Sequence, residues 1–216
     1  MDLLAQLTVL GSLNMDISVT VPALPGPGAT VLGRAASFAP GGKGANQAVA
    51  AARLAAGSGI SVRMIGCVGD DEFGRTLRAN LRREEVDDES VRSVPGASTG
   101  IAMITVDEAG ENMITVAGGA NGEVGPRDLA APGETGGPRD VLVISAEIPV
   151  ATILAALAGQ GGPRPLTVLN LAPAPSSQEA AAVLGTRPDW LIVNESEAAA
   201  VLGRPVSGLD DAAGAA

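Results

Sequence analysis

The chain of 216 residues is long enough to bury a hydrophobic core, as one large domain or as two small ones. With 46% hydrophobic and 18% charged residues it has the composition of a globular protein, and a net charge of -10 argues against a nucleic-acid-binding protein and favours the cytoplasm. The absence of histidine excludes His-dependent triads and His-ligated metal sites, and the single Cys67 excludes an intrachain disulfide. Any catalytic base must therefore be a carboxylate.

Apolar runs alternate with helix-like runs along the chain. A strand is predicted over 7–12, a helix over 44–56 and a second strand over 61–69, followed by a helix with Phe73, Leu77 and Leu81 on one face. Further strands are predicted at 141–145, 166–170 and 190–194, and helices at 149–157, at 178–184 and up to 202. Continuous β-branched strands separated by helices predict an α/β fold with a mostly parallel sheet that is covered on both faces. No apolar stretch is long enough to span a membrane.

Two segments depart from this alternation. Residues 16–38 and 98–121 show pairs of strands around Gly/Pro or Glu-Ala-Gly-Glu turns, without helices. They predict a small antiparallel lid that stands off the main sheet. Gly and Pro are frequent between 118 and 138, where we predict a surface loop around a short helix.

The stretch "APGGKGANQAVAAA" contains Lys43, the only lysine of the chain, among three glycines. Gly41, Gly42 and Gly44 would let a polar ligand approach main-chain N–H groups at a helix start, where the lysine adds a flexible charge. A tight turn with a surface lysine is the alternative interpretation. The stretch is not a Walker A loop, because Ser37 stands where that pattern needs glycine and Gly44 where it needs Ser or Thr.

Polar residues follow two of the predicted strands. Asn14 and Asp16 come after the first strand, and Glu147 comes just past the strand at 141–145. Ligands of open α/β sheets bind at the carboxyl ends of strands, and an amide beside a carboxylate suits a ligand rich in hydroxyl groups. The alternatives are an Asx turn for the first pair and a helix N-terminal acid for Glu147.

Two acidic segments stand at predicted helix starts. Asn194 and Glu197 are three residues apart, so that both can face one side, and the same spacing is typical of a capping box. Asp70, Asp71 and Glu72 are interpreted as an acidic first turn that stabilises a helix without any ligand.

Taken together and in order, these segments resemble a known family. The motifs are "GSLNMD", "PGPGAT", "GGKGANQAVAAARL", "GDDEFG", "STGIAMI", "GEN", "GGAN", "LNLAPAP" and "VNESEA". Their sequence is similar to that of the ribokinase group of the PfkB carbohydrate kinases, over essentially the whole chain. The resemblance implies a ribokinase-like three-layer sandwich with a β lid, in which residues 1–216 form one incomplete sugar kinase domain.

The resemblance also implies roles for individual residues. Asn194 would approach the ATP phosphates, and Glu197 would help to hold a Mg²⁺ ion, mostly through water. The lid segments, about 16–38 and 98–121, would close over ribose and pair with a second subunit in a homodimer. The contacts to the sugar hydroxyls would be made by Asn14, Asp16, Gly42, Lys43, Asn46 and Glu147.

The family reaction moves the γ-phosphoryl group of ATP to the primary hydroxyl of the sugar. The catalytic aspartate of the family lies in a D-T-x-G-A-G-D motif, which this sequence lacks. The residues that hold K⁺ in the family are also absent. Asp210 and Asp211 are interpreted as a solvated helix start. We therefore expect a ribose kinase chain truncated before its catalytic base. The alternatives are a sugar-binding chain without catalysis, or a kinase for fructose or a nucleoside. A dinucleotide-binding domain is disfavoured because no G-x-G-x-x-G follows the first strand.

Overall fold

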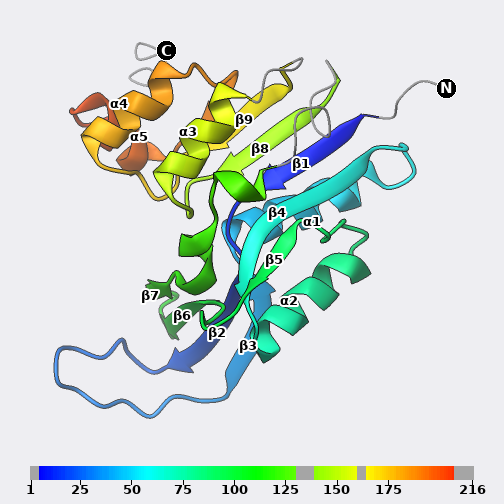
Figure 1. The fold of residues 1–216 in the computed structure, drawn as a ribbon. Helices are drawn as coiled ribbons and strands as arrows, with labels where there is room; N and C mark the ends of the chain where they lie inside the picture. Colours follow the sequence, from blue (N-terminus) through cyan, green and yellow to red (C-terminus); the bar gives the residue numbers. More distant parts are fainter. Residues whose placement is uncertain (1–4, 130–138, 160–163, 207–216) are drawn as a thin grey trace.

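The computed structural model describes residues 5–129, 139–159 and 164–206. Its frame is a six-stranded sheet in the order β10-β9-β8-β1-β4-β5, and a four-stranded sheet in the order β3-β2-β6-β7 stands off one end of it (Figure 1). All neighbouring strands of the six-stranded sheet are parallel. Its strands are β1 (Gln6–Leu10), β4 (Ser61–Gly69), β5 (Val91–Val94), β8 (Val141–Ser145), β9 (Leu166–Asn170) and β10 (Trp190–Ile192).

The helices lie where the sequence predicts them, to within a few residues. They are α1 (Lys43–Ala55), α2 (Glu72–Arg83), α3 (Val150–Ala158), α4 (Ser177–Gly185) and α5 (Glu195–Leu202), with short 3-10 helices η1 (Gly119–Glu123) and η2 (Pro126–Asp128). The predicted strands are confirmed too, whereas β5 was not foreseen. Among the described residues, no helix has both the length and the apolar character needed to cross a membrane.

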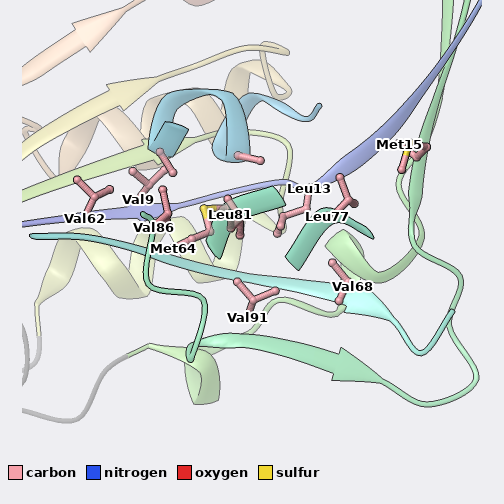
Figure 2. Packing of buried hydrophobic residues seen from close by; sticks show 12 residues of the cluster. Val9, Leu13, Met15, Val62, Met64, Val68, Leu77, Leu81, Val86 and Val91 are labelled. Carbon is pink, nitrogen blue, oxygen red and sulfur yellow. The ribbon is translucent and has the colours of Figure 1, made fainter. Parts of the chain in front are cut away.

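Two hydrophobic cores lie on opposite faces of the six-stranded sheet. Alternation along the strands separates them: Val9 and Met64 enter one core, and the adjoining Leu10 and Ile65 enter the other. Figure 2 shows the first core, where residues of α1 and α2 pack on β1 and β4. Residues of α3 and α4 fill the second. Helices therefore cover both faces, which gives the predicted three-layer α/β sandwich.

The four-stranded sheet consists of β2 (Asn14–Val21), β3 (Ala36–Gly41), β6 (Gly100–Asp107) and β7 (Asn112–Ala117). The predicted pairs are antiparallel, β2 with β3 and β6 with β7, but β2 and β6 run parallel. Both predicted antiparallel pairs are therefore confirmed, but the sheet that they form is mixed rather than antiparallel throughout. The cause is that β2 follows β1 and β6 follows β5, so that both leave the same carboxyl edge of the main sheet in the same direction.

The loop predicted on the surface after residue 118 is partly buried. Ala120, Asn121 and Val124 are at most 2% exposed, because this part of the chain packs against β4 and the second core. The prediction of a surface loop rested on the Gly and Pro content of this segment. It was wrong for this part, because the apolar side chains of Ala120 and Val124 are buried in the second core. The segment 130–138 lies outside the described residues.

Candidate functional site

A cavity of about 170 Å³ opens between the carboxyl edge of the main sheet and the four-stranded sheet. The structure brings all six residues that the sequence singled out for the sugar to this one place, although they come from β2, α1, the loop before α1 and the loop after β8. The cavity is lined by Asn14, Asp16, Gly42, Lys43, Asn46, Ala102, Ile104, Ile114, Val116 and Glu147. Its polar groups thus face a wall of small and aliphatic side chains from β6 and β7.

The paired glycines make room for the polar groups of the cavity. Gly42 has φ of 94°, and a Cβ atom there would lie 2.6 Å from the backbone nitrogen of Asn14. A Cβ atom at Gly41 would lie 2.2 Å from a carboxylate oxygen of Asp16. The tight-turn interpretation is therefore correct as to the backbone conformation, but the glycines also let strand β2 approach the start of α1.

Lys43 is not a free surface lysine. Lys43 is the first residue of α1, and a cation is unfavourable at the N-terminal end of a helix. The first turn of α1 contains no acidic residue that could offset this charge. Glu147 supplies the compensating charge: Oε1 accepts from the Lys43 ammonium, and Oε2 accepts from the hydroxyl of Ser12 at 2.6 Å. The Glu147 side chain is only 12% exposed, against 42% for Lys43. Both side chains line the cavity, and the cation of the pair is the more exposed of the two.

The structure decides against the Asx turn at Asn14 and Asp16 and against a helix-capping role for Glu147. Asn14 and Asp16 lie within β2, paired with β3 on one side and β6 on the other, and form no Asx turn. Helix α3 begins after Glu147 with Pro149 as its N-cap and has no side-chain cap, so Glu147 does not serve that helix.

Asp16 is a half-buried carboxylate for which the described part of the chain supplies no partner. Among the described residues, no hydrogen bond or ion pair reaches its side chain. Burial, and secondly the charge of Glu147, raise the pKa of Asp16 above its ordinary value. An acceptor held at a cavity wall in this way suits a ligand that brings its own hydroxyl donors.

Asn121, which was not among the predicted site residues, does not line the cavity but forms a hydrogen bond with the side chain of Asn14. Its side-chain nitrogen donates to Oδ1 of Asn14 at 2.8 Å. The only sequence signal was the position of Asn121 in "GGAN", one of the motifs that carried the resemblance. Asn46 lies in the first turn of α1 and is exposed.

Asn194 and Glu197 do form a capping box at the start of α5. The Glu197 N–H donates to Oδ1 of Asn194 at 2.8 Å, and the Asn194 N–H donates to Oε2 of Glu197 at 2.9 Å. Neither lines the cavity. They follow β10, three strands from β1 along the same carboxyl edge, which corresponds to roughly 14 Å at the usual strand spacing.

The described residues contain no group of three or more Cys, Asp or Glu side chains that could hold a metal ion. Mg²⁺ often keeps several waters and takes one or two carboxylates together with substrate phosphates, so the single Glu197 fits an outer role toward it.

At the start of α2, Asp71 caps the helix by accepting from the Gly74 N–H at 2.8 Å, which confirms the helix-start interpretation of that acidic segment. Asp210 and Asp211 lie outside the described residues.

The sequence pattern of the pfkB family of carbohydrate kinases matches residues 4–216. The chain belongs to this family. Among its pfkB relatives, a ribokinase from Schizosaccharomyces pombe is 37% identical over 199 residues, which are 91% of this chain and 61% of that protein. A ribokinase from Haemophilus influenzae is 36% identical over 204 residues, or 93% of this chain and 63% of that protein.

The pfkB fold is also evident in solved structures. The structure of Arabidopsis thaliana ribokinase complexed with ribose and ATP aligns with a TM-score of 0.76 at 26% identity, over 99% of this chain and 67% of that one. The present chain thus spans a little over three fifths of the length of the two curated relatives.

Proposed function

We propose that this chain carries the sugar site of a kinase that phosphorylates ribose at its primary 5-hydroxyl with ATP. The observation that carries the proposal is the cavity itself, where donors and acceptors from four separate segments converge in the first part of a pfkB fold. Their number suits a ligand with a hydroxyl on almost every carbon. Relatives named ribokinase favour ribose over fructose or a nucleoside.

The polar groups divide into acceptors and donors. The carboxylate of Asp16 would accept from sugar hydroxyls, while the ammonium of Lys43 and the amides of Asn14 and Asn46 would donate to their oxygens. Holding the sugar at several points would fix its primary hydroxyl in one position, and positioning is a major part of catalysis of phosphoryl transfer.

The nucleotide would lie toward the other end of the same sheet edge. Asn194 would contact the ATP phosphates, and Glu197 would help to place Mg²⁺ through water. When bound, Mg²⁺ neutralises phosphate charge during transfer. The family motif with the catalytic aspartate does not occur in the 216 residues, and no residue described here is assigned as the base; the same holds for the K⁺ ligands.

We further propose that β2, β3, β6 and β7 act as a lid over the sugar and join two subunits in a cytoplasmic homodimer. Large apolar side chains on this sheet that do not line the cavity support the dimer, because each is about half exposed or more: Phe38, Met103 and Met113. Sedimentation velocity of the wild-type chain beside Met103→Lys tests it. A dimer that the substitution dissociates supports the proposal, and a wild-type monomer contradicts it.

The experiment that tests the function is a ribose titration by calorimetry, together with an assay of ADP release with ribose, ATP, Mg²⁺ and K⁺. We expect ribose binding in the wild type and at least tenfold weaker binding in Lys43→Ala, because the substitution removes a donor and leaves Glu147 without its cation. Arg53→Ala is the matched control, since this exposed cation of the same helix pairs with Glu84 away from the cavity.

The outcomes separate the candidate functions. Ribose binding with turnover supports the proposal in full. Ribose binding without turnover indicates a sugar-binding chain that lacks catalysis. A preference for fructose or a nucleoside reassigns the substrate, and no binding of any of these ligands overturns the sugar site.

A further inference from the structure

Asn121 is a buried polar residue that does not line the cavity but contacts a residue that does. It lies in η1, directly after the last strand of the four-stranded sheet, and is 2% exposed. Its Oδ1 accepts from the Leu13 N–H at 2.9 Å, and its Nδ2 donates to the Leu13 carbonyl at 3.1 Å and to Oδ1 of Asn14 at 2.8 Å. All the hydrogen bonds of this amide are therefore made to two consecutive residues, Leu13 and Asn14, and Asn14 lines the cavity.

These bonds leave no freedom in how the two amides are oriented. The Leu13 N–H can only donate and its carbonyl can only accept, so they identify the oxygen and the nitrogen of the Asn121 side chain. The nitrogen of Asn121 then requires an acceptor, and Asn14 must turn its oxygen toward it. The Asn14 nitrogen is left on the other side and finds no hydrogen-bond acceptor among the described residues. Asn14 lines the cavity, so this donor is available to a ligand.

The backbone around the pair is shaped to allow the contact. A Cβ atom at Gly100 would lie 2.2 Å from Oδ1 of Asn14 and 2.4 Å from Nδ2 of Asn121, so only glycine fits between β6 and the two amides. Gly119, with φ of 52°, lies so close to Ser98 that its Cβ would be 2.4 Å from that carbonyl. Two glycines thus bring the buried amide into place from two sides.

We propose that Asn121 is a positioning residue that makes Asn14 a hydrogen-bond donor toward one sugar hydroxyl. The inference rests on the proposed function and deepens it, because it assigns the polarity of one contact. The carboxylate of Asp16, two residues along the same strand and on the same face, is an acceptor. A hydroxyl between them can donate to Asp16 and accept from Asn14, which a methyl or hydrogen in its place cannot do. Asn121 therefore selects for a hydroxyl at this position of the sugar.

The test is Asn121→Asp, which keeps the size of the side chain and the bond from the Leu13 N–H. The new carboxylate cannot donate, so Asn14 would rotate its amide to donate to it and would present its oxygen to the cavity. We expect ribose affinity to fall at least tenfold, the usual scale for a lost hydrogen bond to a buried partner. Thr152→Val is the matched control: it removes a buried hydrogen bond to the Val124 carbonyl, next to η1, without touching Asn14.

The decisive readout is a binding cycle with ribose and its monodeoxy analogues, each lacking one hydroxyl. In the wild type and in Thr152→Val, one analogue should bind at least tenfold more weakly than ribose through loss of this contact. In Asn121→Asp that penalty should shrink to about twofold, while the penalties at other positions persist. If Asn121→Asp showed the same penalty as the wild type for every analogue, the proposal would be overturned, because a merely structural defect weakens the binding of ribose and of all its analogues alike.

A second readout does not depend on the sugar. The side-chain amide signals of Asn14 in ¹⁵N-labelled protein, assigned by their loss in Asn14→Ser, should shift downfield in Asn121→Asp, where the amide nitrogen donates to a carboxylate. They should not shift in Thr152→Val. Unchanged Asn14 signals in Asn121→Asp would refute the positioning role even if ribose binding fell. If the wild type bound no ribose, the proposed function would fail, and these signals would still decide whether Asn121 orients Asn14.

Discussion

Asp16 and Asp88 are both shielded from solvent, but they differ in their hydrogen-bond partners and in the direction in which their pKa is shifted. Asp88, 6% exposed, accepts from Arg78 at 2.6 Å and from Arg82 at 2.8 Å. Burial would raise its pKa, but the bonds from Arg82 and Arg78 outweigh burial and lower the pKa of Asp88. Asp16 receives no such bond from the described residues, and its pKa is raised. The fold thus neutralises the carboxylate that it uses for stability and leaves the one in the cavity for a ligand.

Other structural carboxylates follow the pattern of Asp88. Asp71 caps α2 and also accepts from the Thr99 N–H and hydroxyl, and Asp128 is paired with Arg92 at 2.5 Å. Burial acts against these bonds in each case, yet the pKa of both carboxyls is lowered. Among the described residues, an unpaired, half-buried carboxylate is therefore unusual, and its place in the cavity supports a role in binding.

The largest expected effect is on ribose binding in Asp16→Asn. The amide keeps the shape of the side chain but loses the charged acceptor, so we expect ribose affinity to fall about a hundredfold, or roughly 2.7 kcal/mol. The free energy of unfolding should stay the same or rise, because the substitution removes an unpaired half-buried charge. Calorimetric titration and urea denaturation measure the two quantities. A large loss of stability with unchanged ribose affinity would place Asp16 among the structural carboxylates.

The reverse result is expected for Asp88→Asn. Removing the shared partner of Arg78 and Arg82 should lower the free energy of unfolding by about 2 kcal/mol, less than for a fully buried pair because the arginines are partly exposed. Ribose affinity should change by less than about twofold. Asp87→Asn is the matched control: Asp87 pairs with Arg63 at 3.3 Å and is more exposed, so its loss should cost below about 1 kcal/mol.

The contrast between the two kinds of carboxylate was only partly visible in the sequence. Strands and helices followed from periodicity, and the carboxyl ends of β1 and β8 placed Asp16 and Glu147 at one edge because parallel strands share it. The pairing of Lys43 with Glu147 depends on residues 104 positions apart, which no local pattern encodes. The role of Asn121 and the parallel pairing of β2 with β6 likewise arise only when distant segments meet.

The same two substitutions should change the pH dependence of stability in opposite directions. As pH rises past the ordinary aspartate value of 3.8, the unfolded chain loses a proton that folded Asp16 retains, so this group makes stability fall. Folded Asp88 loses its proton earlier than the unfolded chain, so its stabilising contribution is present above that value and is lost on acidification. Between about pH 3 and pH 6, stability should therefore rise more steeply in Asp16→Asn and less steeply in Asp88→Asn. Parallel curves would mean that neither carboxyl differs between its folded and unfolded states.

The smallest effect is expected at the capping box of α5, where one residue would have a structural and a binding role together. Asn194→Asp keeps the cap, since Asn and Asp cap helices about equally well, and the free energy of unfolding should change by less than about 0.5 kcal/mol. The added charge would repel phosphates, so MgATP should bind about three- to tenfold more weakly. Ser176→Asp is the matched control, because Ser176 and Glu179 form the same kind of capping box on the neighbouring α4. If both substitutions weakened MgATP equally, the effect would come from overall charge, and Asn194 would be a helix cap alone.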